Sequence, residues 1–130
     1  SLAHAGLLAM RKAVLNAGAR ESNLSWVGTP AVQETLGARE RNAALGGGRF
    51  LWDTDGVLGR PAFATKTAPA GALVVGDFSQ AVACIFGPGI QVDVDPSQSF
   101  NSAEVVFRVK LMCDVAVPQP AAFSVATSVS

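Results

Sequence analysis

Hydrophobic and polar residues alternate with the periodicity of an α-helix at the start of the chain. Four apolar residues recur at helical spacing there: Leu7, Met10, Val14 and Ala17. This spacing predicts a helix over residues 2–17. Gly18 is placed to end it, because glycine adopts a left-handed backbone without strain just past a helix.

A second helix is expected after a short strand. Residues 24–27 alternate between apolar and polar, which is typical of a strand. Thr29 can cap a helix with its hydroxyl, and Pro30 suits the first helical position because its missing N–H has no partner there. The apolar spacing then predicts a helix from Pro30 to about residue 44, which the glycines at 46–48 stop.

The second half of the chain predicts strands separated by turns. Short strands are expected at residues 61–65, 72–75, 81–86, 90–95 and 122–125, and the strand at 81–86 is expected to be buried. Turn residues gather at 53–56, at 76–79 and at Gly87-Pro88-Gly89, which should end the buried strand. A polar loop is expected at 96–102.

The longest regular pattern runs from Val105 to Val117. The odd-numbered residues are apolar, while Arg108, Lys110 and Asp114 lie on the opposite side. Such a strand would reach roughly 45 Å, whereas a chain of 130 residues has a radius of gyration near ~14 Å. The strand must therefore bend, contain a bulge or extend beyond its own domain.

The order helix, strand, helix and then strands predicts an α+β fold. The length of 130 residues suits one domain over residues 1–130. Charged residues make up 15% of the chain, against about 25% in average domains. Either the core is large, or other chains cover part of the surface. Trp26 and Trp52 are expected to pack in the core, with a role as anchors of an interface as the alternative.

Charge and hydropathy disfavour two classes of partner. Ten basic and ten acidic residues balance to a net charge of zero, and no cluster of Lys or Arg stands out. A dedicated surface for nucleic acid is therefore disfavoured. No apolar run approaches the ~20 residues that a membrane-spanning helix needs, so we expect no membrane partner.

Residues suited to catalysis are few. The chain has one histidine, His4, and two cysteines, Cys84 and Cys113. A catalytic cysteine needs a base beside its thiol, and zinc needs several ligands at close spacing. Because His4 is distant in sequence from both cysteines, we expect no catalytic, cofactor or metal site. The cysteines lie in apolar runs and are expected to be reduced and buried, with a disulfide as the alternative.

Three polar segments resemble ligand sites only superficially. Asp53-Thr54-Asp55-Gly56 begins like a calcium loop, but the later ligands are missing. Gly46-Gly47-Gly48 is not followed by the Lys and Ser or Thr of a phosphate-binding loop. Asp93 and Asp95 share one face of an alternating strand and are expected to face water.

A series of short motifs nevertheless follows a known order. They are Trp26-Val27-Gly28-Thr29-Pro30, Gly48-Arg49-Phe50-Leu51-Trp52, Leu58-Gly59-Arg60-Pro61, Gly76-Asp77-Phe78-Ser79, Gly89-Ile90-Gln91-Val92 and Pro120-Ala121-Ala122-Phe123. In this order they resemble the major capsid proteins of tailed bacteriophages, which have the Hong Kong 97-type fold. The resemblance covers nearly the whole chain but only the C-terminal part of the family's proteins, chiefly the axial domain.

The resemblance implies a structural role and a specific architecture. It implies a central, mostly antiparallel sheet flanked by two N-terminal helices. It also implies that the chain is a fragment of a longer subunit and does not contain that subunit's peripheral domain, N-terminal arm and extended loop. Such a subunit would associate with copies of itself in pentamers and hexamers of an icosahedral virion shell, after synthesis in the cytoplasm of a bacterial host. The expected contact regions are the tip at Gly46, Gly47 and Gly48, and the turn with Asp53, Asp55 and Gly56.

Two other functions remain open from the sequence. The same fold would suit the shell of an encapsulin-like nanocompartment, and a small cysteine hydrolase is a more distant alternative. The chain also starts within a helical pattern and without methionine, which suggests a piece excised from a longer polypeptide. Alone it is expected to be mostly monomeric, because it would lack most of the assembly interface.

Overall fold

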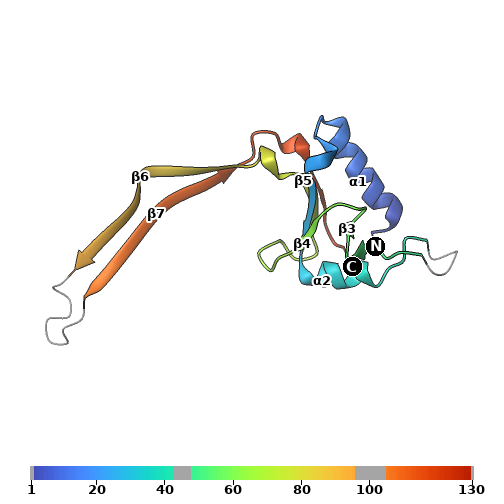
Figure 1. Ribbon diagram of the computed structural model, residues 1–130, viewed down its shortest axis with the longest axis horizontal. Coiled ribbons are helices and arrows are strands. Elements are labelled where there is room, and N and C mark those ends of the chain that lie inside the picture. Colours follow the sequence, from blue (N-terminus) through green and yellow to red (C-terminus); the bar gives the residue numbers. More distant parts are fainter. Residues whose placement is uncertain (1, 43–47, 96–104, 130) are drawn as a thin grey trace. The chain divides into compact units, whose positions relative to one another are not determined.

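The computed structural model describes residues 2–42, 48–95 and 105–129, and these residues form two compact units (Figure 1). The first unit comprises Ser1–Gln80 and Gln119–Ser130, and the second, here called the hairpin unit, comprises Ala81–Pro118. The two units are compact groups of residues in contact, which does not make them separate domains. The single domain expected from the chain length therefore stays a prediction.

Helix α1 begins the first unit and spans His4–Asn16. Its buried residues Leu7, Met10 and Val14 are three of those whose spacing predicted the helix. Gly18 follows with a φ of +92°, the left-handed conformation expected of it. The helix packs against two strands of the sheet, β5 (Leu73–Asp77) and β8 (Phe123–Ala126).

The sheet of the first unit has four strands in the order β4-β1-β5-β8. Their bounds are Ala62–Ala64 for β4, Leu24–Gly28 for β1, Leu73–Asp77 for β5 and Phe123–Ala126 for β8. Strand β4 runs parallel to β1, whereas the β1–β5 and β5–β8 pairs are antiparallel. The predicted α+β fold with a mostly antiparallel sheet is confirmed.

Helix α2 spans Pro30–Gly37 and is shorter than expected. Thr29 caps it, since its hydroxyl oxygen accepts a hydrogen bond from the Val32 amide at 3.4 Å, an interaction worth ~1 kcal/mol. The helix does not continue to residue 44 because the chain enters a backbone ladder: the carbonyl of Arg39 accepts from the Leu51 amide at 2.8 Å. A carbonyl used in this ladder is not available to a further helical turn.

Short elements complete the first unit. A two-stranded hairpin joins β2 (Trp52–Asp53) to β3 (Gly56–Val57), which confirms the turn expected at residues 53–56. Three 3₁₀ turns lie at Glu21–Asn23 (η1), Phe78–Gln80 (η2) and Pro120–Ala122 (η3). The turn expected at 76–79 is therefore shifted, since Gly76 and Asp77 still belong to β5.

The hydrophobic core lies within the first unit. Trp26 is 1% exposed and Trp52 is 8% exposed, so both are core residues as expected. They pack in one cluster with residues of both helices and the sheet: Leu7, Met10, Val14, Leu24, Val32, Leu36, Leu51, Val57, Leu73, Val75 and Val129. Burial of this cluster is the main stabilising contribution to the unit.

The hairpin unit consists of two long antiparallel strands. Strand β6 spans Val82–Asp95 and β7 spans Val106–Ala116. The prediction of a buried strand at 81–86 is wrong, because Ile85 is 67% and Phe86 is 54% exposed. The burial expected of the cysteines is also wrong: Cys84 is half-buried and Cys113 is exposed, and both are free thiols. The physical reason is that a two-stranded ribbon has no second layer to cover it.

The pairing register gives the ribbon one wholly apolar face. Partners such as Val92 with Val109 and Val94 with Phe107 share this face with their neighbours at alternate positions. The apolar face comprises Ala83, Ile85, Val92, Val94, Phe107, Val109, Leu111, Cys113 and Val115. The single orientation predicted for the odd-numbered residues of β7 is thereby confirmed, and all of these side chains are exposed.

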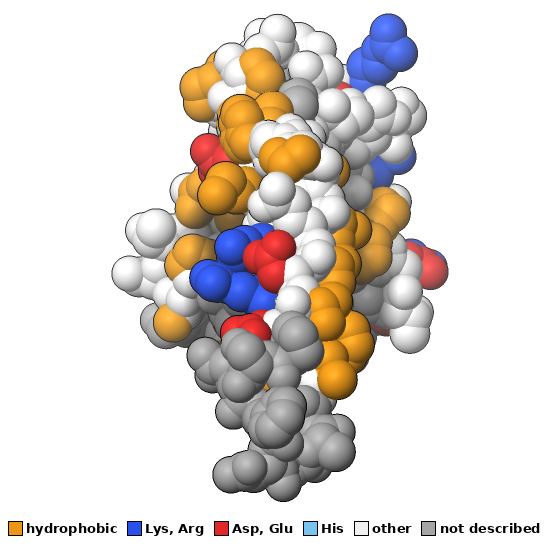
Figure 2. Space-filling model, turned by 90° about the vertical axis from the view of Figure 1, so that its left-hand side faces the viewer, with side chains coloured by type: hydrophobic (Ala, Val, Ile, Leu, Met, Phe, Trp, Pro, Cys, Tyr) orange, Lys and Arg blue, Asp and Glu red, His pale blue; other side chains and the backbone are white. Residues whose placement is uncertain are grey.

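The opposite face of the ribbon, here called the mixed face, has both charged and apolar side chains. Asp93 is the register partner of Arg108 and forms an ion pair with Lys110 at 3.1 Å. Figure 2 shows charged side chains gathered beside a line of hydrophobic ones on the part that faces the viewer. Asp93 is exposed, as expected from the sequence, whereas Asp95, which was expected to face water as well, is half-buried.

Glycines at positions 87 and 89 form a bulge rather than the strand end that we expected. Between Phe86 and Gln91 strand β6 has four residues where β7 has Leu111 alone, so β6 contains three extra residues. Gly87 and Gly89 have φ values of +86° and +85°. Without Gly87-Pro88-Gly89, the alternation of side chains between the two faces would continue unbroken from Phe86 to Ile90. The bulge is therefore an insertion after which the apolar side chains of β6 remain on the apolar face.

Deletion of residues 87–89 is therefore expected to preserve the register of the hairpin. Ile90 would then oppose Leu111, and the pairs from Gln91–Lys110 to Asp95–Val106 would be unchanged. Cross-strand contacts measured by NMR in the wild-type chain and the deletion variant test this. Partners shifted by one or more residues beyond position 90 would contradict it.

Candidate assembly interface

Four of the predicted contact residues lie in the described part of the chain: Gly48, Asp53, Asp55 and Gly56. Gly46 and Gly47 lie outside the described residues. Two backbone segments, 39–41 and 49–51, lead to and from the tip as a short antiparallel ladder. Within it the Arg41 amide donates to the carbonyl of Arg49 at 2.8 Å, and Glu40 and Phe50 form a β-bridge.

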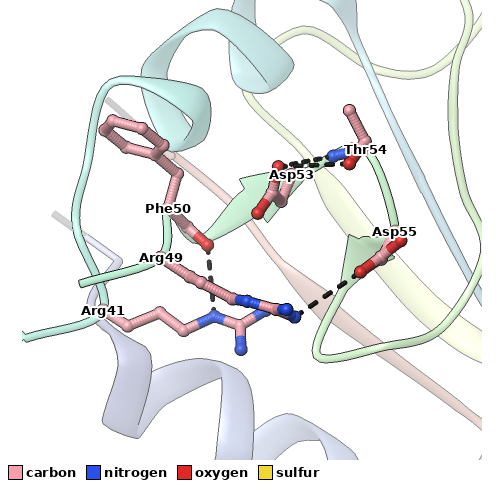
Figure 3. Close-up of polar contacts among 6 residues, drawn as sticks. All are labelled: Arg41, Arg49, Phe50, Asp53, Thr54 and Asp55. Carbon is pink, nitrogen blue, oxygen red and sulfur yellow. Dashed lines mark hydrogen bonds and ion pairs between the residues drawn. The ribbon is translucent and has the colours of Figure 1, made fainter. Parts of the chain in front are cut away.

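Side chains of this ladder reach toward the turn between β2 and β3. The Nε of Arg41 donates to the Phe50 carbonyl at 3.1 Å, which ties its side chain to the ladder. The Nη1 of Arg49 lies 3.5 Å from Oδ2 of Asp55, so one ion pair joins the ladder to the turn that was predicted as a contact region (Figure 3). The Arg49 and Asp55 side chains are 68% and 67% exposed, and a pair in such contact with water contributes at most about 1 kcal/mol.

The turn that presents Asp55 has a strongly constrained backbone. Oδ1 of Asp53 accepts hydrogen bonds from the Thr54 amide at 2.7 Å and the Thr54 hydroxyl at 3.4 Å. Gly56 has a φ of +88°, and a Cβ there would lie 2.0 Å from the Arg60 carbonyl oxygen. Only glycine fits this position in the observed conformation of the turn.

An open groove lies beside the turn. The turn residues 53–56 line it together with Gln33, Trp52, Gly59 and the start of strand β4. Because β4 is an edge strand with Phe63 58% exposed, the groove has an apolar side next to the acidic turn. Sequence reasoning missed Phe63, since nothing in the residues 61–65 tells an edge strand from a central one.

Residues that could bind a metal ion or form a cysteine–histidine pair are not gathered in either unit of the described part of the chain. Within the described ranges no group of three or more His, Cys, Asp or Glu side chains is placed to hold a metal ion. His4 is part of the first unit, whereas Cys84 and Cys113 belong to opposite faces of the hairpin unit, so neither unit by itself contains a cysteine–histidine pair. In the described part of the chain, no helix is long and apolar enough to cross a membrane.

Residues 3–128 match the model of the phage capsid family. The chain belongs to the phage capsid family. The match covers nearly the whole sequence, so the resemblance to tailed-phage major capsid proteins is confirmed. No curated protein sequence matches the chain significantly.

Solved capsid structures share the fold. The capsid of an empty GTA particle, computed with C5 symmetry, is 24% identical with a TM-score of 0.65, and the match covers 88% of this chain and 40% of that one. The capsid of the native GTA particle is also 24% identical, with a TM-score of 0.61, and the match covers 88% of this chain and 41% of that one. The procapsid of satellite phage P4, which includes the size determination (Sid) protein, is 12% identical, with a TM-score of 0.57. That match covers 93% of this chain and 38% of the other. The chain thus spans about 40% of the length of these capsid chains.

Substitution of Gly56 by alanine is expected to destabilise the first unit strongly. The new methyl group would clash with backbone atoms of Arg60 and Ala62, which cannot rotate away. We expect a loss of about 3 kcal/mol in the free energy of unfolding, measured by chemical denaturation.

Gly59→Ala is the matched control. Gly59 also has a positive φ, of +71°, but a Cβ there would meet no atom within 4 Å. Its cost should therefore be the backbone strain alone, about 1 kcal/mol. Equal losses for the two variants would show that the close approach at Arg60 does not constrain the turn.

Proposed function

We propose that this chain is part of the major capsid subunit of a phage or prophage and that it works as a structural protein, not as an enzyme. The family match over residues 3–128 is the observation that carries this proposal. In the proposed role, copies of the complete subunit associate into pentamers and hexamers of an icosahedral shell. The virion capsid would be the final location of the protein, after synthesis in the host cytoplasm.

Two features of the first unit support a role in self-association. It presents an open, charged surface made of the ladder at 39–41 and 49–51 and the turn at 53–56. The groove beside it is lined by the start of strand β4, which lies at an edge of the sheet and exposes Phe63. No observation specifically favours the nanocompartment or the cysteine hydrolase that the sequence left open.

We further propose that the first unit corresponds to the axial domain of capsid proteins and that the hairpin unit joins it to the rest of a longer subunit. The share of about 40% of the matched capsid chains supports this assignment. The apolar face of the hairpin supports it independently, because an isolated two-stranded ribbon is at best marginally stable in water. Residues of the same polypeptide outside this sequence would cover the face.

The exposed apolar face also bears on the behaviour of the chain alone. A contiguous apolar surface of this kind favours association in solution, whereas the loss of the remaining subunit interface favours a monomer. The expectation that the isolated chain is mostly monomeric stays a prediction.

The complete natural polypeptide that contains these residues is expected to form closed particles or rings. Negative-stain electron microscopy and light scattering at increasing concentration measure this directly. A polypeptide that stays monomeric at high concentration under varied salt would overturn the proposed function.

Cys113 reports on the covering of the hairpin. This thiol lies on the apolar face and is exposed in the present chain, whereas Cys84 lies on the mixed face. Alkylation of Cys113, followed by mass spectrometry, is expected to be at least about tenfold slower in the complete polypeptide, because a covered thiol reacts only on local opening. Equal rates in the two proteins would mean that the apolar face remains open.

A further inference from the structure

The ladder and the turn of the first unit place both signs of charge side by side on one surface. Arg41 and Arg49 come from the ladder, and Asp53 and Asp55 come from the turn. We call these four residues the charged surface. Figure 3 shows the guanidinium of Arg49 extending across to the carboxylate of Asp55, while Arg41 lies along the ladder.

Backbone contacts hold this charged surface in place. Arg41 is tied to the Phe50 carbonyl, Asp53 to the Thr54 amide, and the turn to the positive φ of Gly56. For the Arg41 side chain and the backbone of the turn, less conformational entropy is therefore left to lose when a partner binds. A surface held in this way is suited to repeated, identical contacts.

The ion pair within the chain leaves much of the binding capacity of both groups unused. Arg49 and Asp55 are separated by 3.5 Å and about two-thirds exposed. A guanidinium has five N–H donors and a carboxylate about four acceptor sites, so each group can bind a second partner. Where a neighbouring molecule excludes water from the pair, the attraction between opposite charges becomes stronger.

We propose that the charged surface is the contact between neighbouring copies in a ring, with Arg49 of one copy paired to Asp55 of the next. This inference rests on the proposed function and specifies the interaction that closes the capsomer. The occupant follows from charge complementarity: the basic half of the surface fits the acidic half of an identical copy. In such a ring Arg49 of each copy meets the copy on one side and Asp55 meets the copy on the other, so the contact is heterologous and can close. Because the two groups lie 3.5 Å apart, the charged surface would then lie close to the ring axis.

Two opposite charge reversals in separate copies test the proposal. In the complete polypeptide, Arg49→Asp alone would place two carboxylates against each other at every contact between copies. Asp55→Arg alone would place two guanidinium groups together there. Each variant by itself is expected to need at least about tenfold more protein to assemble than the wild type, because like charges face each other at every contact.

An equimolar mixture of the two variants is expected to assemble close to the wild-type concentration. If the two variants alternate around a ring of six, every contact between copies pairs a carboxylate of one variant with a guanidinium of the other. Within each variant chain, however, the pair remains like-charged, so rescue by mixing can only come from contacts between copies. Rings of five leave one mismatched contact, and the rescue should therefore favour six-membered rings.

Lys12→Glu provides the control, because this exposed residue of α1 undergoes a similar reversal of charge outside the charged surface. It should assemble like the wild type, and thermal unfolding should show that every variant is folded at the temperature of the assembly experiment. Wild-type assembly by either single variant, or a mixture no better than its components, would overturn the inference while the proposed function stands. Failure of the wild-type polypeptide itself to assemble would instead overturn the proposed function.

Discussion

Apolar surface must be covered by a second layer, and the two units of this chain meet that requirement differently. In the first unit, α1 packs on β5 and β8, and residues of both helices and the sheet share one core. The hairpin unit is a single ribbon, and its apolar face remains exposed. The same kind of sequence, rich in valine and leucine, is therefore buried in one unit and exposed in the other. A chain built in this way is adapted to contacts beyond its own residues.

The alternation of side chains along β6 and β7 gathers the apolar ones on a single face of the hairpin. Three extra residues in β6 separate two segments that would otherwise alternate without a break. A single extra residue that continued the alternation would instead move every later side chain to the opposite face. The glycines at 87 and 89 accept the positive φ values that the bulge requires, and so the ribbon changes direction without losing its single apolar face.

The candidate interface depends on contacts that the local sequence pattern does not reveal. Arg49 follows a run of glycines and Asp55 lies in a turn, and neither position by itself indicates a partner. The backbone ladder between segments 39–41 and 49–51 brings them to 3.5 Å. Its constrained backbone and its opposite charges are the properties that suit a repeated contact between copies, and the family match provides the setting in which such a contact is expected.

The sequence by itself determined the local elements and the family. Helix α1, the Thr29 cap and the facing of β7 follow from periodicity and capping within a few residues, which a sequence displays directly. The structure alone decided the end of α2 at Gly37, the parallel pairing of β4 with β1, the meeting of Arg49 with Asp55 and the exposure of residues 81–86. Each of these depends on how separate segments lie against one another, and an apolar strand has the same pattern whether or not another layer covers it.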